Sequence, residues 1–575
     1  MPESRDDIVE SARRTGDFDV IVVGGGINGI GVFRDLALQG LRVLLVERND
    51  FCSGCSAAPS RMIHGGLRYL ENGEFGLVRE SLRERDALLL NAPHMVRPLP
   101  TTIPIASRFS GLLNAAVSFF GGKSRPAQRG ALPVKIGLAL YDWVTRKRRL
   151  MPTHEFRGAE ATFARWPGLT PHLRFSATYY DAWISHPERL GLELVLDAAR
   201  ENRSAVALNY AEIARVGDGF EITDTISGER FAATARIVVN ATGAWIDDTG
   251  RALSGAELPE RLVSGTKGSH LILDNPVLHD ALGGHMIFFE NADGRVCIVF
   301  PYLGKVLAGS TDIRVDAPTR VRCEDDECDY ILTSLGRIFP GIPLDPGQVV
   351  FSYSGIRPLP MSDHDFTGRI SRGHSTVRVE GTPPQLCMVG GKWTTFRAFA
   401  EQTADAVLAE LGVARVHDTL ALPIGGGGGM PEDPGVLERD LAGTFGISAV
   451  RAAHLVNAYG TRARAVLAFC IPRPDDVSLD GATEITAAEI AFLVQHERAL
   501  RLGDLVLRRT DLAITGVLNA NHITRIGEVA AAELGWTGDR LAREVADLTA
   551  ELETYYGVSP AMLEDRTHSR STECA

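Results

Sequence analysis

Residues 19–47 read DVIVVGGGINGIGVFRDLALQGLRVLLVE, and this stretch decides how the first part of the chain folds. Residues 20–23 are wholly apolar and β-branched, which is typical of a strand buried on both faces. Residues 30–39 follow with a helical pattern, and residues 41–46 form a second apolar run. The stretch therefore predicts a strand–helix–strand unit of a parallel sheet.

The turn inside this unit carries the motif G-x-G-x-x-G, made by Gly24, Gly26 and Gly29. Such glycines allow a tight turn, close approach of the backbone to a pyrophosphate, and close packing of helix on strand. The helix N-terminus offers free N–H groups to phosphates. Glu47, at the end of the second strand, is placed to bind a ribose hydroxyl. Together these features predict a dinucleotide site rather than an ordinary glycine-rich turn, without distinguishing FAD from NAD.

The composition is that of a globular protein with 575 residues, enough for about three or four domains. The net charge of −12 argues against general nucleic-acid binding. Eight scattered cysteines favour a reducing cytosol. Cys52 and Cys55 form C-x-x-C without a second pair to complete a zinc site, so we expect no metal. They are either small residues of a loop or a redox dithiol.

The predicted fold class is α/β. Residues 18–421 are expected to form a Rossmann-like domain that binds FAD or NAD, interleaved with a mixed-sheet substrate domain. Residues 422–435 hold three prolines and five successive glycines and read as a linker, after which residues 436–575 read as an all-helical C-terminal domain. Residues 1–17 are expected to be a polar tail without the features of a signal peptide. The polar end of the chain, from Asp565, is expected to be disordered.

Residues 105–150 are strongly basic, with nine basic residues and one acidic residue, although the chain as a whole is acidic. Leu113, Val117 and Phe120 fall on one face of a short helix. Basic residues beside an amphipathic segment are typical of helices that lie in a membrane interface. A buried helical pair with a solvated basic rim explains the pattern equally well. No apolar run reaches the roughly 18 residues of a membrane span, so we expect a cytosolic or peripheral protein.

Four separate segments carry cationic side chains at predicted strand ends and turns. A guanidinium binds phosphate bidentately and is always charged, so several of them together favour an anion site. Taken singly, each would be better explained as a surface salt bridge. The segments are His64-Gly65-Gly66-Leu67-Arg68-Tyr69, Lys267-Gly268-Ser269-His270, Arg357 with Arg372, and Gly390-Gly391-Lys392.

These segments resemble motifs of the FAD-dependent glycerol-3-phosphate dehydrogenases. The resemblance covers residues 64–71, 267–270, 355–359 and 390–397, as well as the opening glycine motif. It continues with HERALRLGDLVLRRT at 496–510, in the helical part, so it extends in order over almost the whole chain. HGGLRYLE together with GGKWTT is far more specific than the glycine motif alone.

The resemblance implies oxidation of sn-glycerol 3-phosphate to dihydroxyacetone phosphate, with electrons passing through FAD to a membrane quinone. It implies a homodimer, peripheral on an anionic membrane surface at the inner face of the cell membrane. The FAD is expected to be noncovalent, because no motif for a flavin attachment point is present. The residues implied at the substrate are Arg68, Tyr69, His270, Arg357, Arg372, Lys392 and Thr394. Those implied at FAD are Gly24, Gly26, Gly29, Glu47, Ser56, His64, Gly65 and Gly391.

Three catalytic roles follow for this reaction. Arg357 and Arg372 would fix the substrate phosphate. His270 would take the proton of the C2 hydroxyl, because a neutral imidazole is the usual base near neutral pH. Alternatively, His270 only orients that hydroxyl by a hydrogen bond. Lys392 and the helix N-terminus at Thr394 would stabilise negative charge that develops on the flavin.

Other functions fit the same motifs less fully. A glycerol-3-phosphate oxidase would use oxygen as the acceptor, and an amino-acid oxidase on the same scaffold would bind a carboxylate through its arginines. A flavin-binding redox-sensing module without turnover would have lost the charged set, which is present here. Two residues depart from the family pattern: Pro59 stands where a hydroxyl is expected, and Trp393 stands where an aliphatic residue is usual.

Overall fold

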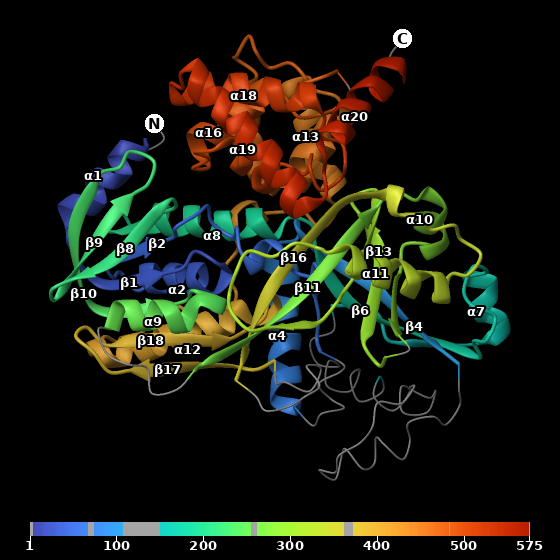
Figure 1. Cartoon of the computed structure of the whole chain (residues 1–575), viewed down its shortest axis with the longest axis horizontal. Coiled ribbons are helices and arrows are strands. Elements are labelled where there is room, and N and C mark those ends of the chain that lie inside the picture. Colours follow the sequence, from blue (N-terminus) through green and yellow to red (C-terminus); the bar gives the residue numbers. More distant parts are fainter. Residues whose placement is uncertain are drawn as a thin grey trace.

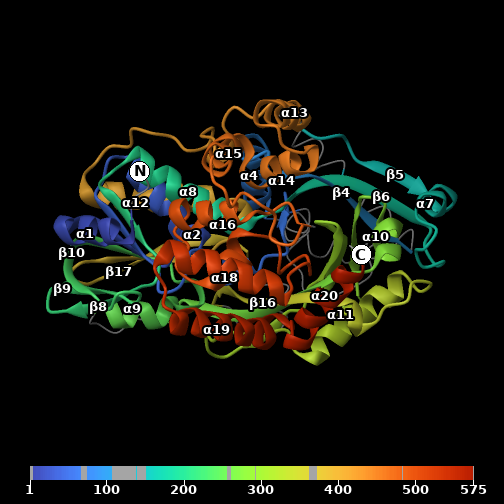
Figure 2. The ribbon, with the colours of Figure 1, turned by 90° about the horizontal axis from the view of Figure 1, so that it is seen from above.

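The computed structural model describes residues 4–66, 74–106, 138, 150–254, 261–291, 293–361, 372–481 and 483–573. Two sheets lie side by side, and a group of helices from the C-terminal part lies across one end of both (Figure 1). Seen from above, these helices lie over the region where the two sheets meet (Figure 2). The predicted fold class is confirmed: a Rossmann-like domain, a mixed-sheet domain and a helical domain.

The first sheet has a parallel core built on the predicted unit. Its main order is β17 (His374–Val379), β18 (Gln385–Gly390), β10 (Arg230–Asn240), β1 (Asp17–Val23), β2 (Val43–Val46) and β7 (Ala205–Leu208), with β8 (Ala211–Val216) and β9 (Gly219–Asp224) extending from β10. β1 pairs in parallel with both β10 and β2. The edge strand β17 runs antiparallel to β18, and β9 runs antiparallel to both β10 and β8.

Successive side chains of β1 enter two different hydrophobic cores, one on each face of this sheet. Val20 and Val22 belong to one core, shared with α2 (Ile27–Leu38), α8 (Pro187–Glu201) and α12 (Phe396–Leu411). Ile21 and Val23 belong to another core, on the face that α1 (Arg5–Thr15) covers. A strand that is buried on both faces must be apolar throughout, as this one is. The helix α2 begins three residues before the predicted position.

The second sheet has ten strands and follows the order β15-β11-β14-β13-β12-β4-β6-β3, with β16 pairing β11 and β5 pairing β6. Its strands are β3 (Met62–Ile63), β4 (Val96–Ile105), β5 (Glu155–Gly158), β6 (Phe175–Ile184), β11 (Val263–Leu273), β12 (Met286–Glu290), β13 (Val296–Tyr302), β14 (Lys305–Gly309), β15 (Ile313–Val315) and β16 (Val349–Pro360). Its helices are α4 (Phe75–Asn91), α7 (Ala159–Arg165), α10 (Pro276–Leu282) and α11 (Asp325–Ile338), while α9 (Ile246–Ser254) belongs to the first sheet's side. The strands of the two sheets alternate along the chain, so the two domains are interleaved.

The C-terminal part is helical. It consists of α13 (Pro434–Phe445), α14 (Ala449–Tyr459), α15 (Ala463–Cys470), α16 (Ala487–His496), α17 (Leu502–Asp504), the π-helical turn η8 (Leu505–Arg509), α18 (Ala520–Leu534), α19 (Gly538–Tyr556) and α20 (Pro560–Glu573). The side chain of Thr486 caps α16 by accepting from the N–H of Glu489. The hydrophobic core of these C-terminal helices is continuous with Phe351 and Tyr353 of β16, so the helices pack on the second sheet.

The structure corrects two predictions, the polar tail at residues 1–17 and the disordered end of the chain from Asp565. Residues 5–15 form helix α1, which starts with a capping box at Ser4 and buries Ile8, Val9 and Ala12. The expectation of a polar tail is wrong there, because three apolar residues on one face are too few to show in the composition. The end of the chain is also helical, since α20 continues past Asp565 to Glu573.

The glycine-rich linker is packed rather than loose. Its residues 425–427 form a 3₁₀ turn. The N–H of Gly425 donates to Asp197 Oδ2 at 2.8 Å and the N–H of Gly426 donates to Glu193 Oε2 at 3.2 Å. A Cβ on Gly426 would lie 1.8 Å from the carbonyl oxygen of Tyr459. The glycines therefore let the chain pass closely between α8 and α14.

The predicted membrane segment falls almost entirely outside the described residues, which resume after 106 only at 138 and 150. None of the described helices is long and apolar enough to cross a bilayer.

Candidate functional site

A cavity of about 1490 Å³ runs between the two sheets. Its walls come from the turn after β1, the loop after β2, the end of β10, and the ends of β16 and β18. The carboxyl ends of parallel strands are where α/β sheets bind ligands. The cavity thus brings together segments that are more than 300 residues apart in the sequence.

The turn after β1 is as tight as the glycine motif predicts. Gly24 has a φ of +105°, and a Cβ there would lie 2.7 Å from the carbonyl oxygen of Ala241. A Cβ on Gly29 would lie 2.0 Å from the carbonyl oxygen of Gly24. Gly24 and Gly26 line the cavity, whereas Gly29 serves the packing of α2 on β1.

Glu47 lies on the wall where the sequence places it. Its carboxylate accepts hydrogen bonds from the N–H of Gly25 at 2.7 Å and the N–H of Asn49 at 2.8 Å. Burial raises the pKa of Glu47, and these two N–H groups oppose the shift. The side chain is therefore fixed beside the glycine turn, where it faces the cavity.

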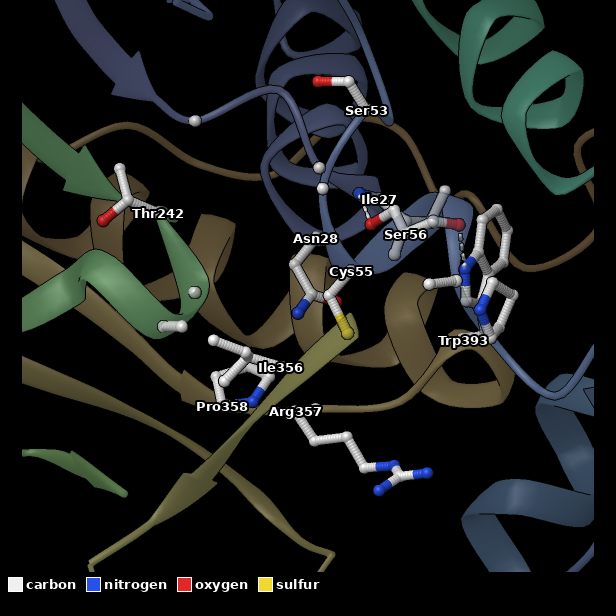
Figure 3. A pocket seen from close by; sticks show the side chains of 18 of the residues that line it. Ile27, Asn28, Ser53, Cys55, Ser56, Thr242, Ile356, Arg357, Pro358 and Trp393 are labelled. Carbon is white, nitrogen blue, oxygen red and sulfur yellow. Dashed lines mark hydrogen bonds between the residues drawn. The ribbon is translucent and has the colours of Figure 1, made fainter. Parts of the chain in front are cut away.

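The loop after β2 crosses in front of α2 (Figure 3). Ser56 Oγ accepts from the N–H of Ile27 at 2.9 Å, and the indole N–H of Trp393 donates to the carbonyl of Ser56 at 3.0 Å. The carbonyl of Pro59 accepts from the Tyr353 hydroxyl at 3.1 Å. Both departures from the family pattern, Trp393 and Pro59, thus help to fix this loop.

Arg357 extends from β16 into the cavity (Figure 3). Its Nη1 donates to Asp312 Oδ1 at 3.1 Å, and Arg372 Nη2 lies 3.9 Å from Asp312 Oδ2. The guanidinium lies so close to Gly268 that a Cβ there would be 1.8 Å from Nη2. Burial lowers the pKa of Arg357, and Asp312 opposes the shift. Two cations and one carboxylate therefore share this end of the cavity.

His270 lies in the same wall, on β11. The register of β11 and β16 places it opposite Tyr353, and the two rings stack at 5.1 Å. Its side chain is buried, and neither ring nitrogen has a hydrogen-bond partner within the described part of the chain. Burial, followed by the charge of Arg357, lowers the pKa of His270 to about 3. A neutral imidazole thus lines the cavity with an open hydrogen-bonding capacity.

Lys392 and Thr394 follow β18 at the same end. Lys392 Nζ donates to Ser81 Oγ of α4 at 2.9 Å. Burial lowers the pKa of Lys392 to about 8, and Glu80 opposes the shift. Thr394 Oγ1 accepts from the N–H of His64 at 3.2 Å. Lys392 is thus mostly charged at neutral pH and becomes mostly neutral above about pH 8.

Of the remaining predicted residues, His64 and Gly391 line the cavity, whereas the N–H of Gly65 donates to the buried carboxylate of Asp181 at 2.8 Å. Arg68 and Tyr69 lie outside the described residues. The sequence prediction missed Asp312 and Asn28. Asp312 lies in the short connection between β14 and β15, and no motif pointed to it.

Two known protein families match the two parts of this architecture. The family described as FAD dependent oxidoreductase covers residues 19–406, and the C-terminal domain of alpha-glycerophosphate oxidase covers residues 417–541. A glycerol-3-phosphate dehydrogenase from Synechocystis is 35% identical over 559 residues, which cover 92% of this chain and 95% of that protein. The chain belongs to the FAD-dependent glycerol-3-phosphate dehydrogenase family.

Other members of this family are similarly related. The aerobic glycerol-3-phosphate dehydrogenase of Escherichia coli is 31% identical, with 89% of this chain and 96% of that protein covered. A glycerol-3-phosphate dehydrogenase from Bacillus halodurans, solved in complex with FAD, superposes with a TM-score of 0.74 over 97% of this chain and 98% of that chain, at 24% identity. At this identity the superposition supports the fold alone.

The residues of the cavity fit the cofactor of this family. The N-cap Gly26 has no side chain that could cap α2, and the first N–H of the helix, that of Ile27, donates to Ser56 of the loop after β2. Asn28 Oδ1 is a buried acceptor without a partner in the described residues. The turn would hold the pyrophosphate of FAD and Glu47 would hold a ribose, while the loop at Ser56 would cover the dinucleotide.

Proposed function

We propose that this enzyme oxidises sn-glycerol 3-phosphate to dihydroxyacetone phosphate, with noncovalently held FAD as the electron acceptor. The observation that carries the proposal is His270, which is buried, has no hydrogen-bond partner among the described residues, and shares a cavity with Arg357, Arg372 and the dinucleotide turn. An anion site next to a proton acceptor matches a substrate that carries both a phosphate and a hydroxyl. The names of the family members given above support the same substrate.

The phosphate is assigned to Arg357 and Arg372. Both guanidiniums line the cavity and both face the carboxylate of Asp312. A phosphate dianion brings two negative charges and at least three acceptor oxygens, which suits two planar donors better than one. Because Arg357 is pressed flat on Gly268, its donors are already oriented before the substrate arrives.

The hydroxyl at C2 is assigned to His270. A ring that accepts a proton must be neutral beforehand, and burial keeps His270 neutral. Stacking on Tyr353 fixes the plane of the His270 ring, and the residue lines the cavity. A phosphate bound at Arg357 offsets the cation that lowers the pKa of His270, and the ring therefore becomes more basic when the substrate is bound.

FAD, when bound, accepts the hydride from C2. The chain's own contribution at this end is Lys392, whose charge favours an anionic neighbour, together with the N-terminus of the helix that begins at Phe396. The hydrogen bond to Ser81 holds the ammonium group of Lys392 against α4.

The electron acceptor is proposed to be a membrane quinone. The basic segment of residues 105–150 would dock a homodimer on anionic lipid at the inner face of the cell membrane, a proposal that rests on the sequence pattern. Oxygen is the second candidate, favoured by the match of residues 417–541 to a domain named for alpha-glycerophosphate oxidase. Oxygen consumption with glycerol 3-phosphate, compared with reduction of a soluble quinone, distinguishes the two acceptors.

The deciding experiment is anaerobic titration of the purified yellow protein. Glycerol 3-phosphate should bleach the flavin absorbance, while glycerol, which lacks the phosphate, should not. Glycine and proline serve as controls for the amino-acid oxidase alternative. Bleaching by an amino acid but not by glycerol 3-phosphate would refute the proposed substrate, and a protein that binds FAD but is bleached by neither would favour the non-catalytic alternative.

A further inference from the structure

The C-terminal motif at residues 496–510 has no place in the reaction described so far. In the structure it lies where the helical domain meets the loop after β2. Two consecutive arginines, Arg508 and Arg509, end the π-helical turn η8, in which the N–H of Thr510 donates to the carbonyl of Leu505. π-Helical turns are rare and occur frequently at functional sites. Here the turn directs both arginines to the same carboxylate.

That carboxylate is Asp50, in the loop between the ribose-binding position and Ser56. Arg508 Nε donates to Asp50 Oδ2 at 2.6 Å, and Arg509 donates to both oxygens at 2.7 and 2.9 Å. Asn209 Nδ2 supplies a fourth donor at 3.0 Å. Asp50 is completely buried. Burial alone would raise the pKa of Asp50, but the two arginines outweigh it and lower the pKa to about 2.

A second set of contacts joins the same motif to the cavity wall. Asp504 Oδ1 accepts from Arg508 Nη2 at 2.6 Å and from the hydroxyl of Tyr210. Tyr210 lines the cavity and has a φ of +53°, which a non-glycine residue adopts only when its surroundings hold it there. Arg501 lies over the Tyr210 ring at 5.1 Å. Arg501 and Arg508 themselves also line the cavity.

These contacts lead directly to the cofactor wall. The N–H of Tyr210 donates to the carbonyl of Asn49 at 2.9 Å, and the N–H of Asn49 donates to Glu47 at 2.8 Å. We propose that the Asp50–Arg508–Arg509 cluster is a positioning device for FAD, by which docking of the helical domain fixes the loop of residues 47–56. Binding of FAD and docking of the C-terminal motif then strengthen each other, because coupling between two binding events is reciprocal.

The chain contains a matched control for this proposal. Arg189 of α8 donates to Glu497 of the same motif at 2.7 and 3.0 Å, and this pair is as fully buried as the cluster at Asp50. It joins the same two parts of the molecule, but neither of its members lines the FAD cavity. Any effect that arises only from loosening the helical domain should therefore be common to both pairs.

The test compares Arg508→Gln with Glu497→Gln. FAD is removed from each purified protein, and FAD is titrated back while the quenching of its fluorescence is followed. We expect the dissociation constant of FAD to rise on the order of 10²-fold for Arg508→Gln, to recover in part for Arg508→Lys, and to stay within about threefold for Glu497→Gln. Equal loss in Arg508→Gln and Glu497→Gln, or no loss in Arg508→Gln, would overturn the proposal.

Two further measurements keep the proposal testable if Arg508→Gln does not fold. Tyr210→Phe removes only the hydroxyl that donates to Asp504, and it should weaken FAD about threefold to tenfold. In the wild-type protein, added FAD should slow amide hydrogen exchange at residues 500–510, because the linkage is reciprocal. Exchange in that segment that does not respond to FAD, or a Tyr210→Phe variant with wild-type affinity, would argue that the cluster serves the fold alone.

Discussion

Two arginine–carboxylate contacts in this molecule use the same chemistry in opposite ways. Arg357 and Asp312 meet at 3.1 Å in the cavity, where their side chains are 24% and 17% exposed. Arg509 and Asp50 meet at 2.7 Å under the helical domain, where the side chains are 1% and 0% exposed. Asp50 has every oxygen occupied by donors, whereas the contact at Asp312 is open to solvent and to an incoming anion.

The difference shows what each contact can do. A partly exposed ion pair contributes about 0–1 kcal/mol, so an anion with two charges can displace or share it at little cost. Breaking a fully buried pair leaves an uncompensated charge and costs about 3–5 kcal/mol. The first contact therefore suits a site that must exchange ligands, and the second suits an interface that must stay closed.

The largest expected effect is on the open contact. Arg357→Ala should weaken binding of glycerol 3-phosphate on the order of 10³-fold, because the bound phosphate would lose one partner of a desolvated charge pair, which costs about 2–5 kcal/mol. The flavin content should stay at the wild-type level. Substrate affinity is read from the concentration dependence of anaerobic flavin bleaching. Arg378→Ala, which removes an arginine that pairs with two surface glutamates, is the control. Equal loss of FAD would mean that Arg357 supports the fold.

The next effect concerns the base beside the open contact. His270→Ala should slow flavin reduction at saturating substrate by about 10²-fold, the low end for a general base. Anaerobic stopped-flow absorbance measures this step directly. His285→Ala removes a histidine that directly precedes β12 of the same sheet and does not line the cavity, and it should leave the rate unchanged. A near-normal rate in His270→Ala would leave His270 with an orienting role only.

The sequence predicts one side of this comparison well. The glycine turn and Glu47 are local features, because strand period, turn glycines and helix start all lie within 29 residues. The proposed substrate residues Arg357 and His270 were predicted from motifs, and the structure places both in the wall of one cavity. The contact of Arg357 with Asp312 was not predicted, because it arises from the side-by-side packing of β11, β14 and β16.

The other side of the comparison escapes sequence reasoning for a physical reason. A charged residue such as Asp50 is usually exposed, and only a partner far along the chain makes its burial possible. Its partners lie 458 and 459 residues away. Helix α1 was missed for a related reason, since Ile8, Val9 and Ala12 become a hydrophobic face only against the sheet that covers them. Long-range pairing, rather than local pattern, decided both cases.

A smaller effect should appear as a pH dependence. Lys392 carries its charge below its pKa of about 8 and loses the charge above it. The substrate phosphate stays a dianion over this range, because its second pKa is about 6. Lys392 is also among the residues proposed to contact the substrate. At pH 9 only about a tenth of it remains protonated, so the KM for glycerol 3-phosphate should rise about tenfold between pH 7 and pH 9. Lys392→Arg keeps the charge and should flatten this profile. A wild-type KM that is constant to pH 9 would contradict the assignment.

The smallest effect tests whether the open contact is truly exchangeable. In Asp312→Asn the arginines lose a carboxylate that competes with the substrate phosphate, and the amide preserves its shape. Removing a partly exposed competitor should gain about 0.6 kcal/mol, which tightens binding of glycerol 3-phosphate and of inorganic phosphate about threefold. Phosphate affinity is measured by its competition with the substrate in anaerobic bleaching. The matching change at the closed contact, Asp50→Asn, should instead lower the melting temperature and the flavin content. If Asp312→Asn weakens phosphate binding, then Asp312 holds Arg357 and Arg372 in their binding geometry, and the two contacts are alike in being structural.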